Sequence, residues 1–500
     1  MQLFLYNKFS AFLVAGLLLI HFVSGCEKKR SPEKAPGEAK PVAGKTVFSK
    51  PTGMNVKETK LADIPKDFMQ WREIFYSADG RQVSYVAQKN GKEVMVTEIA
   101  GEERITGGYD EISFLARSFD GLRSAFGGKA GGKKHLVLDG IEMPEPYHEE
   151  VAPSSFSPDG RFVACEVGGI HENQWFIALF DKEKEIYRSP VFSNSNMFPV
   201  FSPDSRLLVF SLGDTKKNTV FFFDVLNRKV IKEQVYAGFH TGSFSFSSDS
   251  SRVVYEAQKD GKKFLVLQDF GRNQERRAEL PGWAGYFELT PDGKHVVYNV
   301  LREAKQYVVV GPWEAPERGK ASRPYDAISK PVIGPDATTV AFYAMRAGKW
   351  IGVVGDSEYP AEYDGVGDAP MTFSPNGLTL AYAARKGGTQ DKTGVIGGKW
   401  VMVVLHVGQA GTAKEGPSYD MVVSPVFSPD GRRIAYRART GSIDKAKRFI
   451  VTADADTGNV IRKGPVCDEI WPPVWSADGK NVGYGARIGR ELWWKVENLL

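Results

Sequence analysis

Four tyrosine–aspartate pairs recur along the chain, each 10 to 13 residues before the Asp or Asn of a turn motif. They are Tyr109-Asp110, Tyr325-Asp326, Tyr363-Asp364 and Tyr419-Asp420. A phenol donates and accepts hydrogen bonds, and a carboxylate accepts them or pairs with a cation. Two interpretations therefore stay open. The pairs form repeated hydrogen bonds between neighbouring units of the fold, or they form a ring that contacts a ligand or a protein partner.

Other sequence patterns that could carry chemistry have simpler explanations. The glycine-rich stretch 127–133 is similar in pattern to a phosphate-binding loop, but Lys134 stands where such loops need Ser or Thr. We predict a hairpin turn there, and a strand-connecting turn at 454–459 in place of a calcium loop. The acidic stretch 142–150 is predicted to be a solvated crossing.

Histidines and cysteines do not point to a metal or cofactor. The seven histidines include no His-x-His or His-x-x-x-His pair, so we expect no metal site and no cofactor. Cys165 and Cys467 are predicted to be free buried thiols. Since no Gly-x-Ser-x-Gly stretch occurs either, we expect a protein that is not an enzyme.

The N-terminus has the features of a secretory targeting segment. An apolar run from Ala11 to Val23 follows Lys8 and ends in Val23-Ser24-Gly25-Cys26. The run is short for a membrane span and fits a secretory signal peptide over residues 1–25. The four residues 23–26 resemble the lipobox of bacterial lipoproteins, which implies that Cys26 becomes the lipidated first residue of the mature protein.

Residues 26–60 read as a flexible tether. They are rich in Lys, Glu, Pro and Gly, with Phe48 as the only aromatic residue, so they cannot bury enough apolar surface to fold. Acyl chains on Cys26 would anchor the protein without a spanning helix. The residue after the cysteine is Glu27. In the enteric lipoproteins that this segment resembles, an Asp at that position marks retention in the inner membrane. The resemblance therefore favours a protein anchored in the outer membrane and facing the periplasm.

Residues 61–500 contain ten copies of one turn motif, of which Phe156-Ser-Pro-Asp-Gly160 is typical. Its Asp or Asn falls at positions 79, 120, 159, 204, 249, 292, 336, 376, 430 and 478. The mean spacing is about 44 residues, a period found in propellers and solenoid arrays.

The residues around each turn select a propeller. Pro, Asp and Gly in this order form a β-hairpin turn. Four residues after the Asp comes an aliphatic side chain and six residues after it an aromatic one, in nine of ten copies each. A spacing of two places both on one face of a strand. Further strands follow, such as 92–96, 175–179, 264–267, 349–353 and 399–403, and four strands in about 44 residues make a propeller blade.

The repeat, apolar-Ser-Pro-Asp-Gly-Lys/Arg-x-aliphatic-Ala-aromatic, resembles the WD40-like repeats of TolB-type bacterial β-propellers over residues 71–500. We predict an all-β fold of about ten four-stranded blades, closed by an N-terminal strand near 56–61 that completes the last blade. Two smaller propellers are the alternative.

Composition limits the partners. The formal net charge of +5 comes from 65 basic and 60 acidic residues. This near balance of charges is not typical of a protein that binds nucleic acid. The resemblance implies a non-catalytic, membrane-tethered envelope protein that presents a propeller face to a protein or glycan partner. The alternative function is a propeller enzyme, such as a polysaccharide lyase, that acts at the channel mouth.

Overall fold

The computed structural model describes residues 53–499, except 148–149, 169–173, 194–198, 214–216, 238–243, 260, 280–285, 368, 392–393, 410, 412 and 443–444. Cys26, the signal peptide and most of the predicted tether therefore lie outside the described residues. Within the described part of the chain, no helix is long and apolar enough to cross a membrane.

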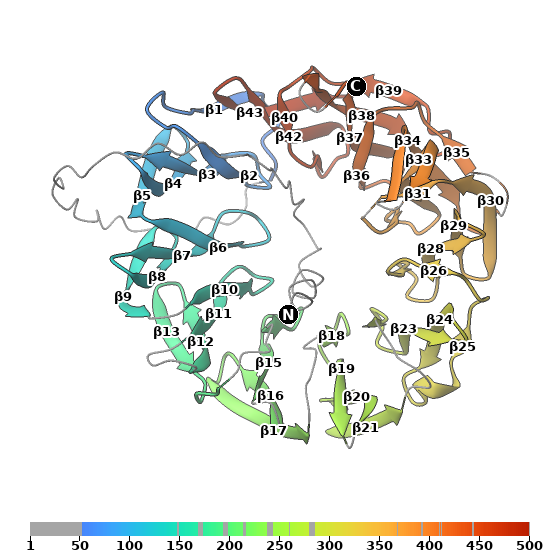
Figure 1. The fold of residues 1–500 in the computed structure, drawn as a ribbon, viewed down its shortest axis with the longest axis horizontal. Coiled ribbons are helices and arrows are strands. Elements are labelled where there is room, and N and C mark those ends of the chain that lie inside the picture. The colour runs from blue at the N-terminus through green and yellow to red at the C-terminus, as the bar shows by residue number, and fades with distance from the viewer. Residues whose placement is uncertain are drawn as a thin grey trace. The chain divides into compact units, whose positions relative to one another are not determined.

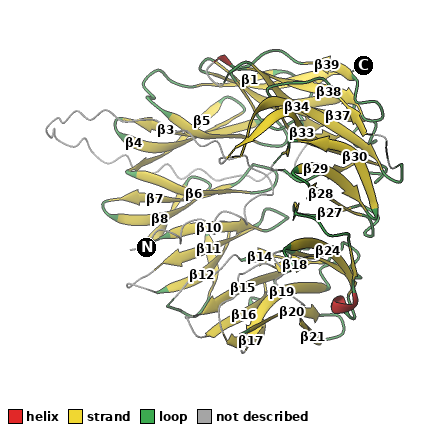
Figure 2. Ribbon diagram, turned by 45° about the vertical axis from the view of Figure 1, so that its right-hand side comes forward, coloured by secondary structure: helices red, strands yellow, loops and turns green. Residues whose placement is uncertain are grey.

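Ten antiparallel sheets follow one another around a ring, as predicted (Figure 1). Almost all of the ring is strand (Figure 2), and the short 3₁₀ helix η1 (Pro316–Arg318) follows β24. Blades 1 to 5 are built from these strands in chain order: β2 (Trp71–Tyr76), β3 (Gln82–Lys89), β4 (Lys92–Ile99), β5 (Glu102–Tyr109); β6 (Glu111–Arg117), β7 (Ser124–Ala130), β8 (Lys133–Leu138), β9 (Ile141–Tyr147); β10 (Val151–Phe156), β11 (Phe162–Gly168), β12 (Trp175–Asp181), β13 (Lys184–Arg188); β14 (Val200–Phe201), β15 (Leu207–Gly213), β16 (Lys217–Asp224), β17 (Lys229–Ala237); β18 (Phe244–Phe246), β19 (Arg252–Lys259), β20 (Lys262–Asp269), β21 (Gln274–Glu279).

Blades 6 to 10 follow the same order, but in blades 7, 8 and 10 the innermost strand is split in two. Their strands are β22 (Phe287–Leu289), β23 (His295–Arg302), β24 (Lys305–Pro312), β25 (Lys320–Ala321); β26 (Ala327–Ile328), β27 (Val332–Ile333), β28 (Val340–Arg346), β29 (Lys349–Val354), β30 (Ser357–Tyr363); β31 (Gly365–Val366), β32 (Thr372–Phe373), β33 (Thr379–Asp391), β34 (Gly394–His406), β35 (Ala413–Glu415); β36 (Met421–Phe427), β37 (Arg433–Thr440), β38 (Lys447–Asp454), β39 (Val460–Lys463); β40 (Glu469–Ile470), β41 (Val474–Trp475), β42 (Asn481–Ile488), β43 (Glu491–Asn498) and β1 (Thr59–Asp63).

Strand β1 closes the ring as the outermost strand of blade 10. It pairs antiparallel with β43, where Thr59 lies opposite Trp494 and Asp63 opposite Glu491. One core cluster contains Ala62 and Leu492 of blade 10 together with Val83 and Tyr85 of blade 1. Since blades 10 and 1 share a core, the chain forms one ring, and the alternative of two smaller propellers is wrong.

The turn motif works as its sequence predicts. In blade 9, Ser428 donates its hydroxyl hydrogen to Asp430 Oδ1 at 2.5 Å, and Asp430 Oδ1 accepts the backbone N–H of Arg432 at 3.0 Å. Gly431 has φ +72°, a left-handed conformation that glycine adopts without strain. The residue at this position is left-handed in all ten copies, including Ser205, Ser250 and Ala337.

The periodic apolar residues form the contacts between blades. The residue six positions after each Asp or Asn is buried in all ten copies, from Tyr85 to Tyr484 and including Cys165. In blade 9, Ile434 and Tyr436 pack in a cluster with blade 8, whereas Ala435 packs in a cluster with blade 10. Alternate residues of the second strand therefore contact opposite neighbours.

Four smaller predictions concern a hairpin, a turn, an acidic crossing and the two cysteines. Strands β7 and β8 make the glycine-rich stretch 127–133 part of a hairpin, and 454–459 is a turn between β38 and β39, as predicted. The prediction of a solvated crossing at 142–150 was wrong for its first half, because Ile141–Tyr147 is the outermost strand of blade 2. Tyr147 is buried there. Cys165 and Cys467 are buried and free.

Candidate functional site

The four Tyr-Asp pairs lie where the chain passes from the outermost strand of one blade to the innermost strand of the next. Each aspartate accepts a hydrogen bond from a lysine of its own blade's third strand: Lys92 for Asp110, Lys305 for Asp326, Lys349 for Asp364 and Lys399 for Asp420. This hydrogen bond lowers the pKa of each aspartate below its usual range.

The aspartates also reach the following blade. The second carboxylate oxygen accepts a backbone N–H from that blade's hairpin, at 3.0 Å from Ala347 for Asp326 and at 2.8 Å from Gly441 for Asp420. The backbone N–H of Asp420 donates to the Arg439 carbonyl at 2.9 Å. Each aspartate therefore joins a lysine of one blade to the backbone of the next.

The tyrosines are buried, with exposed fractions of 1–4%. Three of them donate to a glutamate on the outermost strand of the following blade: Tyr109 to Glu142 at 2.7 Å, Tyr325 to Glu358 at 2.8 Å and Tyr363 to Glu415 at 2.9 Å. Burial raises the pKa of all three phenols above the ordinary value. These contacts favour the first of the two interpretations, in which the pairs join neighbouring blades, and contact with a ligand or partner stays a prediction.

Residues that the repeat does not require lie on the innermost strands, which face the centre of the ring (Figure 1). The pairing of β2, β6 and β36 with their neighbours is interrupted by bulges. Glu73, Phe114 and Ser424 lie in these bulges with positive φ values of 53°, 54° and 58°. Strained, non-glycine backbone of this kind is concentrated at binding sites. Phe114 leaves 51% of its surface exposed.

The most distinctive cluster of such residues lies between blades 6 and 7. Tyr286 donates its hydroxyl hydrogen to Glu288 of β22, and the Lys330 ammonium lies 5.2 Å from the centre of the Tyr286 ring. Lys330 lies between β26 and β27, the two segments of the innermost strand of blade 7. The buried Asn299 Oδ1 has no hydrogen-bond partner among the described residues. We name Tyr286, Glu288, Asn299 and Lys330 the blade 6–7 cluster.

The blade 6–7 cluster combines a cation, a phenol, an amide and a carboxyl group. Burial raises the pKa of Glu288, and Lys330 opposes that shift only in part. Such a set can hydrogen-bond the hydroxyl, amide or carboxylate groups of a polar ligand. We did not predict this cluster from the sequence, although Glu288 was an available signal. It stands four residues before the motif Asp, where the other copies carry small or apolar residues.

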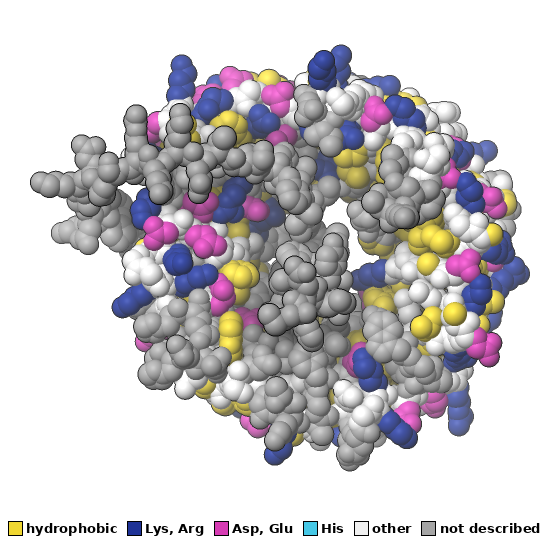
Figure 3. Space-filling view, viewed as in Figure 1, with side chains coloured by type: hydrophobic (Ala, Val, Ile, Leu, Met, Phe, Trp, Pro, Cys, Tyr) yellow, Lys and Arg dark blue, Asp and Glu magenta, His cyan; other side chains and the backbone are white. Residues whose placement is uncertain are grey.

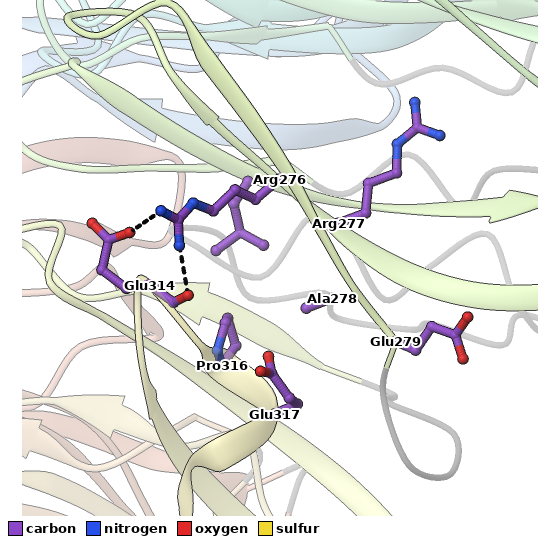
Figure 4. A pocket seen from close by; sticks show the side chains of 8 residues that line it. Arg276, Arg277, Ala278, Glu279, Glu314, Pro316 and Glu317 are labelled. Carbon is purple, nitrogen blue, oxygen red and sulfur yellow. Dashed lines mark hydrogen bonds and ion pairs between the residues drawn. The ribbon is translucent and has the colours of Figure 1, made fainter.

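A hollow lies on the outer side of the ring, between β21 and η1. It has a volume of about 410 Å³ and is lined by Leu267, Arg276, Arg277, Ala278, Glu279, Glu314, Pro316 and Glu317. Two of its charged groups pair with each other: Arg276 Nη2 lies 2.7 Å from Glu314 Oε2, and Arg276 Nη1 donates to the Glu314 carbonyl (Figure 4). The space-filling view shows an opening near the centre of the ring, with charges of both signs spread around the rim (Figure 3).

No group of three or more His, Cys, Asp and Glu residues in the described ranges is arranged to hold a metal ion.

Comparisons with known proteins bear on the fold alone. No family model and no curated protein matches the chain. Among solved structures, it is similar to hydrazine synthase of Kuenenia stuttgartiensis, with 15% identity over 60% of this chain and 94% of that chain and a TM-score of 0.32. A eukaryotic initiation factor matches with 13% identity over 78% and 96% and a TM-score of 0.46. TolB from Acinetobacter baumannii matches with 15% identity over 71% and 80% and a TM-score of 0.27.

Proposed function

We propose that this chain is a lipid-anchored protein of the bacterial cell envelope that binds a protein or glycan partner at the channel of its propeller. The observation that carries the proposal is the position of side chains that the blade repeat does not need. Glu73, Phe114 and Ser424 lie in bulges of the innermost strands, and Lys330 lies between the two segments of the innermost strand of blade 7. The recurrent Tyr-Asp pairs are instead bonded within the fold.

The anchor is tested by cell fractionation. The full chain and a Cys26→Ser variant are expressed in a Gram-negative host, and their membrane association is compared. The resemblance of residues 23–26 to a lipobox predicts that the wild type partitions into detergent with the outer membrane and that the variant does not. Membrane association that persists in Cys26→Ser would contradict lipid anchoring.

Binding is tested with purified peptidoglycan sacculi and the detergent-solubilised full chain. Lys330→Ala removes the cation of the blade 6–7 cluster, and Lys320→Ala is the control, because Lys320 is exposed on the outermost strand of blade 6 and pairs with Asp356. We expect the protein to sediment with sacculi, and Lys330→Ala to bind at least fivefold less. Equal binding by both variants would exclude the cluster as the contact.

One observation favours an enzyme as the second candidate. Glu288 has a raised pKa and a phenol in hydrogen-bond contact, which is the pairing that general acid–base catalysis uses. A polysaccharide lyase acting at the channel would cleave a uronic-acid polymer and release unsaturated products that absorb ultraviolet light. Activity lost in Glu288→Gln with unchanged melting temperature would support this candidate over simple binding.

A further inference from the structure

Arg437 is an unusual residue for its position on the second strand of blade 9. It lies seven residues after the motif Asp430, a position that holds Val86, Gly127, Ala383 and Gly485 in four other blades, and no other copy has arginine there. Ala435, two residues earlier on the same face of β37, packs with blade 10. The Arg437 side chain therefore lies between blades 9 and 10.

The contacts of Arg437 come from the innermost strands of both blades. Its Nη1 donates to the Ile470 carbonyl of β40 at 3.1 Å, and its Nη2 donates to Ser424 Oγ of β36 at 3.0 Å. Nε has no hydrogen-bond partner among the described residues. A guanidinium has five N–H donors, so most of its hydrogen-bonding capacity is left over.

The charge of Arg437 has no counter-ion in the described part of the chain. Only 8% of the residue is exposed, and none of the described carboxylates lies within salt-bridge distance of it. Burial lowers the pKa of Arg437 to about 10. A buried, unpaired cation is costly, because it has lost its hydration without gaining an opposite charge.

Two other arginines at boundaries between blades are paired. Arg123 lies 2.8 Å from Asp139, with side-chain exposures of 6% and 8%, and Arg252 lies 3.0 Å from Asp269. Both also donate to a carbonyl of the next blade, as Arg437 does. The fold therefore supplies a carboxylate to the buried Arg123 and to the partly buried Arg252, and supplies none to Arg437.

We propose that Arg437 is the anion-binding residue of a site in the channel wall between blades 9 and 10, which takes the carboxylate or phosphate group of a ligand. Ser424 lies beside it in the bulge of the innermost strand β36, with its left-handed backbone. The anion approaches from the channel and is bound by the free N–H groups of Arg437 and by the Ser424 hydroxyl. This inference rests on the proposed function and gives the partner an anionic group.

The test measures anion binding to the purified full chain, without any macromolecular partner. Melting temperature and calorimetric affinity are measured with acetate and, separately, inorganic phosphate, at ionic strength held constant with chloride. The two anions distinguish a carboxylate from a phosphate ligand. We expect one of them to raise the melting temperature of the wild type, and Arg437→Met to weaken its binding at least tenfold.

A matched variant separates a binding arginine from a structural one. In the chloride buffer without acetate or phosphate, Arg437→Met is expected to melt at a higher temperature than the wild type, because an apolar side chain replaces an unpaired charge. Arg252→Met is expected to melt lower, because it leaves Asp269 buried and unpaired, and to keep the anion response. An Arg437→Met variant that melts lower and responds normally to both anions would overturn the proposal. If the protein failed to bind sacculi, the anion-binding result would still stand, because it is measured without a macromolecular partner.

Discussion

The Tyr325 hydroxyl donates a hydrogen bond to Glu358 Oε1 at 2.8 Å, which joins the end of blade 6 to the outermost strand of blade 7. Tyr325→Phe and Tyr363→Phe are expected to lower the free energy of unfolding by about 1–2 kcal/mol, because each removes a buried bond to a carboxylate. Tyr419→Phe is the control, since the Tyr419 hydroxyl has no partner among the described residues. Chemical denaturation measures the free energy of unfolding of all three variants. An equal loss in Tyr419→Phe would contradict a stabilising role for the tyrosine–glutamate hydrogen bonds.

The Lys–Asp–backbone contacts predict the effect of neutralising an aspartate. Asp364→Asn and Asp420→Asn each lose the ion pair with a lysine, so the melting temperature is expected to fall by about 1–2 °C. Asp356→Asn breaks only an exposed pair with Lys320 and should change little. Loss of partner binding by the first two variants at unchanged melting temperature would favour the ligand-contacting interpretation instead.

The turn at Ala337 holds a non-glycine residue in a strained backbone conformation. Ala337 has φ +58° in the position that glycine holds in seven of the ten turns. Ala337→Gly is expected to stabilise the protein by about 1 kcal/mol, because it relieves the left-handed strain. Ser205→Gly offers the matched comparison, since Ser205 Oγ accepts the Asp159 N–H at 3.1 Å and that bond would be lost. Its expected gain is close to zero. Thermal unfolding distinguishes the two.

The same turn predicts a dependence on acid. Burial opposes ionisation of Asp336, but hydrogen bonds from Thr339 and Thr338 outweigh it and lower the pKa of Asp336 to about 2. Because this pKa is below that of the unfolded chain, near 3.9, the ionised carboxylate stabilises the fold above about pH 4. That stabilisation is lost as the pH falls towards 2. Asp336→Asn should therefore show a shallower loss of melting temperature over this interval, and an unchanged slope would contradict the prediction.

Arg490 is expected to be important for ring closure. Its Nε donates to the Ile64 carbonyl at 2.8 Å and its Nη2 to the Phe68 carbonyl at 3.0 Å, so it fixes the segment between β1 and β2. Arg490→Met should lower the free energy of unfolding by about 1–3 kcal/mol and expose residues 59–68 to trypsin. Lys480→Met, at an exposed turn of the same blade, is the control. Equal digestion of both variants would show that closure does not depend on Arg490.

The local and periodic features of this protein were determined by the sequence alone. The Ser-Asp-Gly turns, the strands around them and the buried position of Tyr85 and its equivalents followed from spacing, because turn chemistry and the two-residue period of a strand act over a few residues. The strand that closes the ring was also predictable, since the last repeat lacks its fourth strand.

Only the tertiary structure decided what lies between the blades. That Tyr363 bonds to Glu415, 52 residues away, or that Arg437 is buried without a carboxylate while Arg252 has Asp269, cannot be read from spacing. Such contacts depend on which side chains of adjacent sheets come face to face. The single ring was decided in the same way, by the apolar surface that blade 10 shares with blade 1.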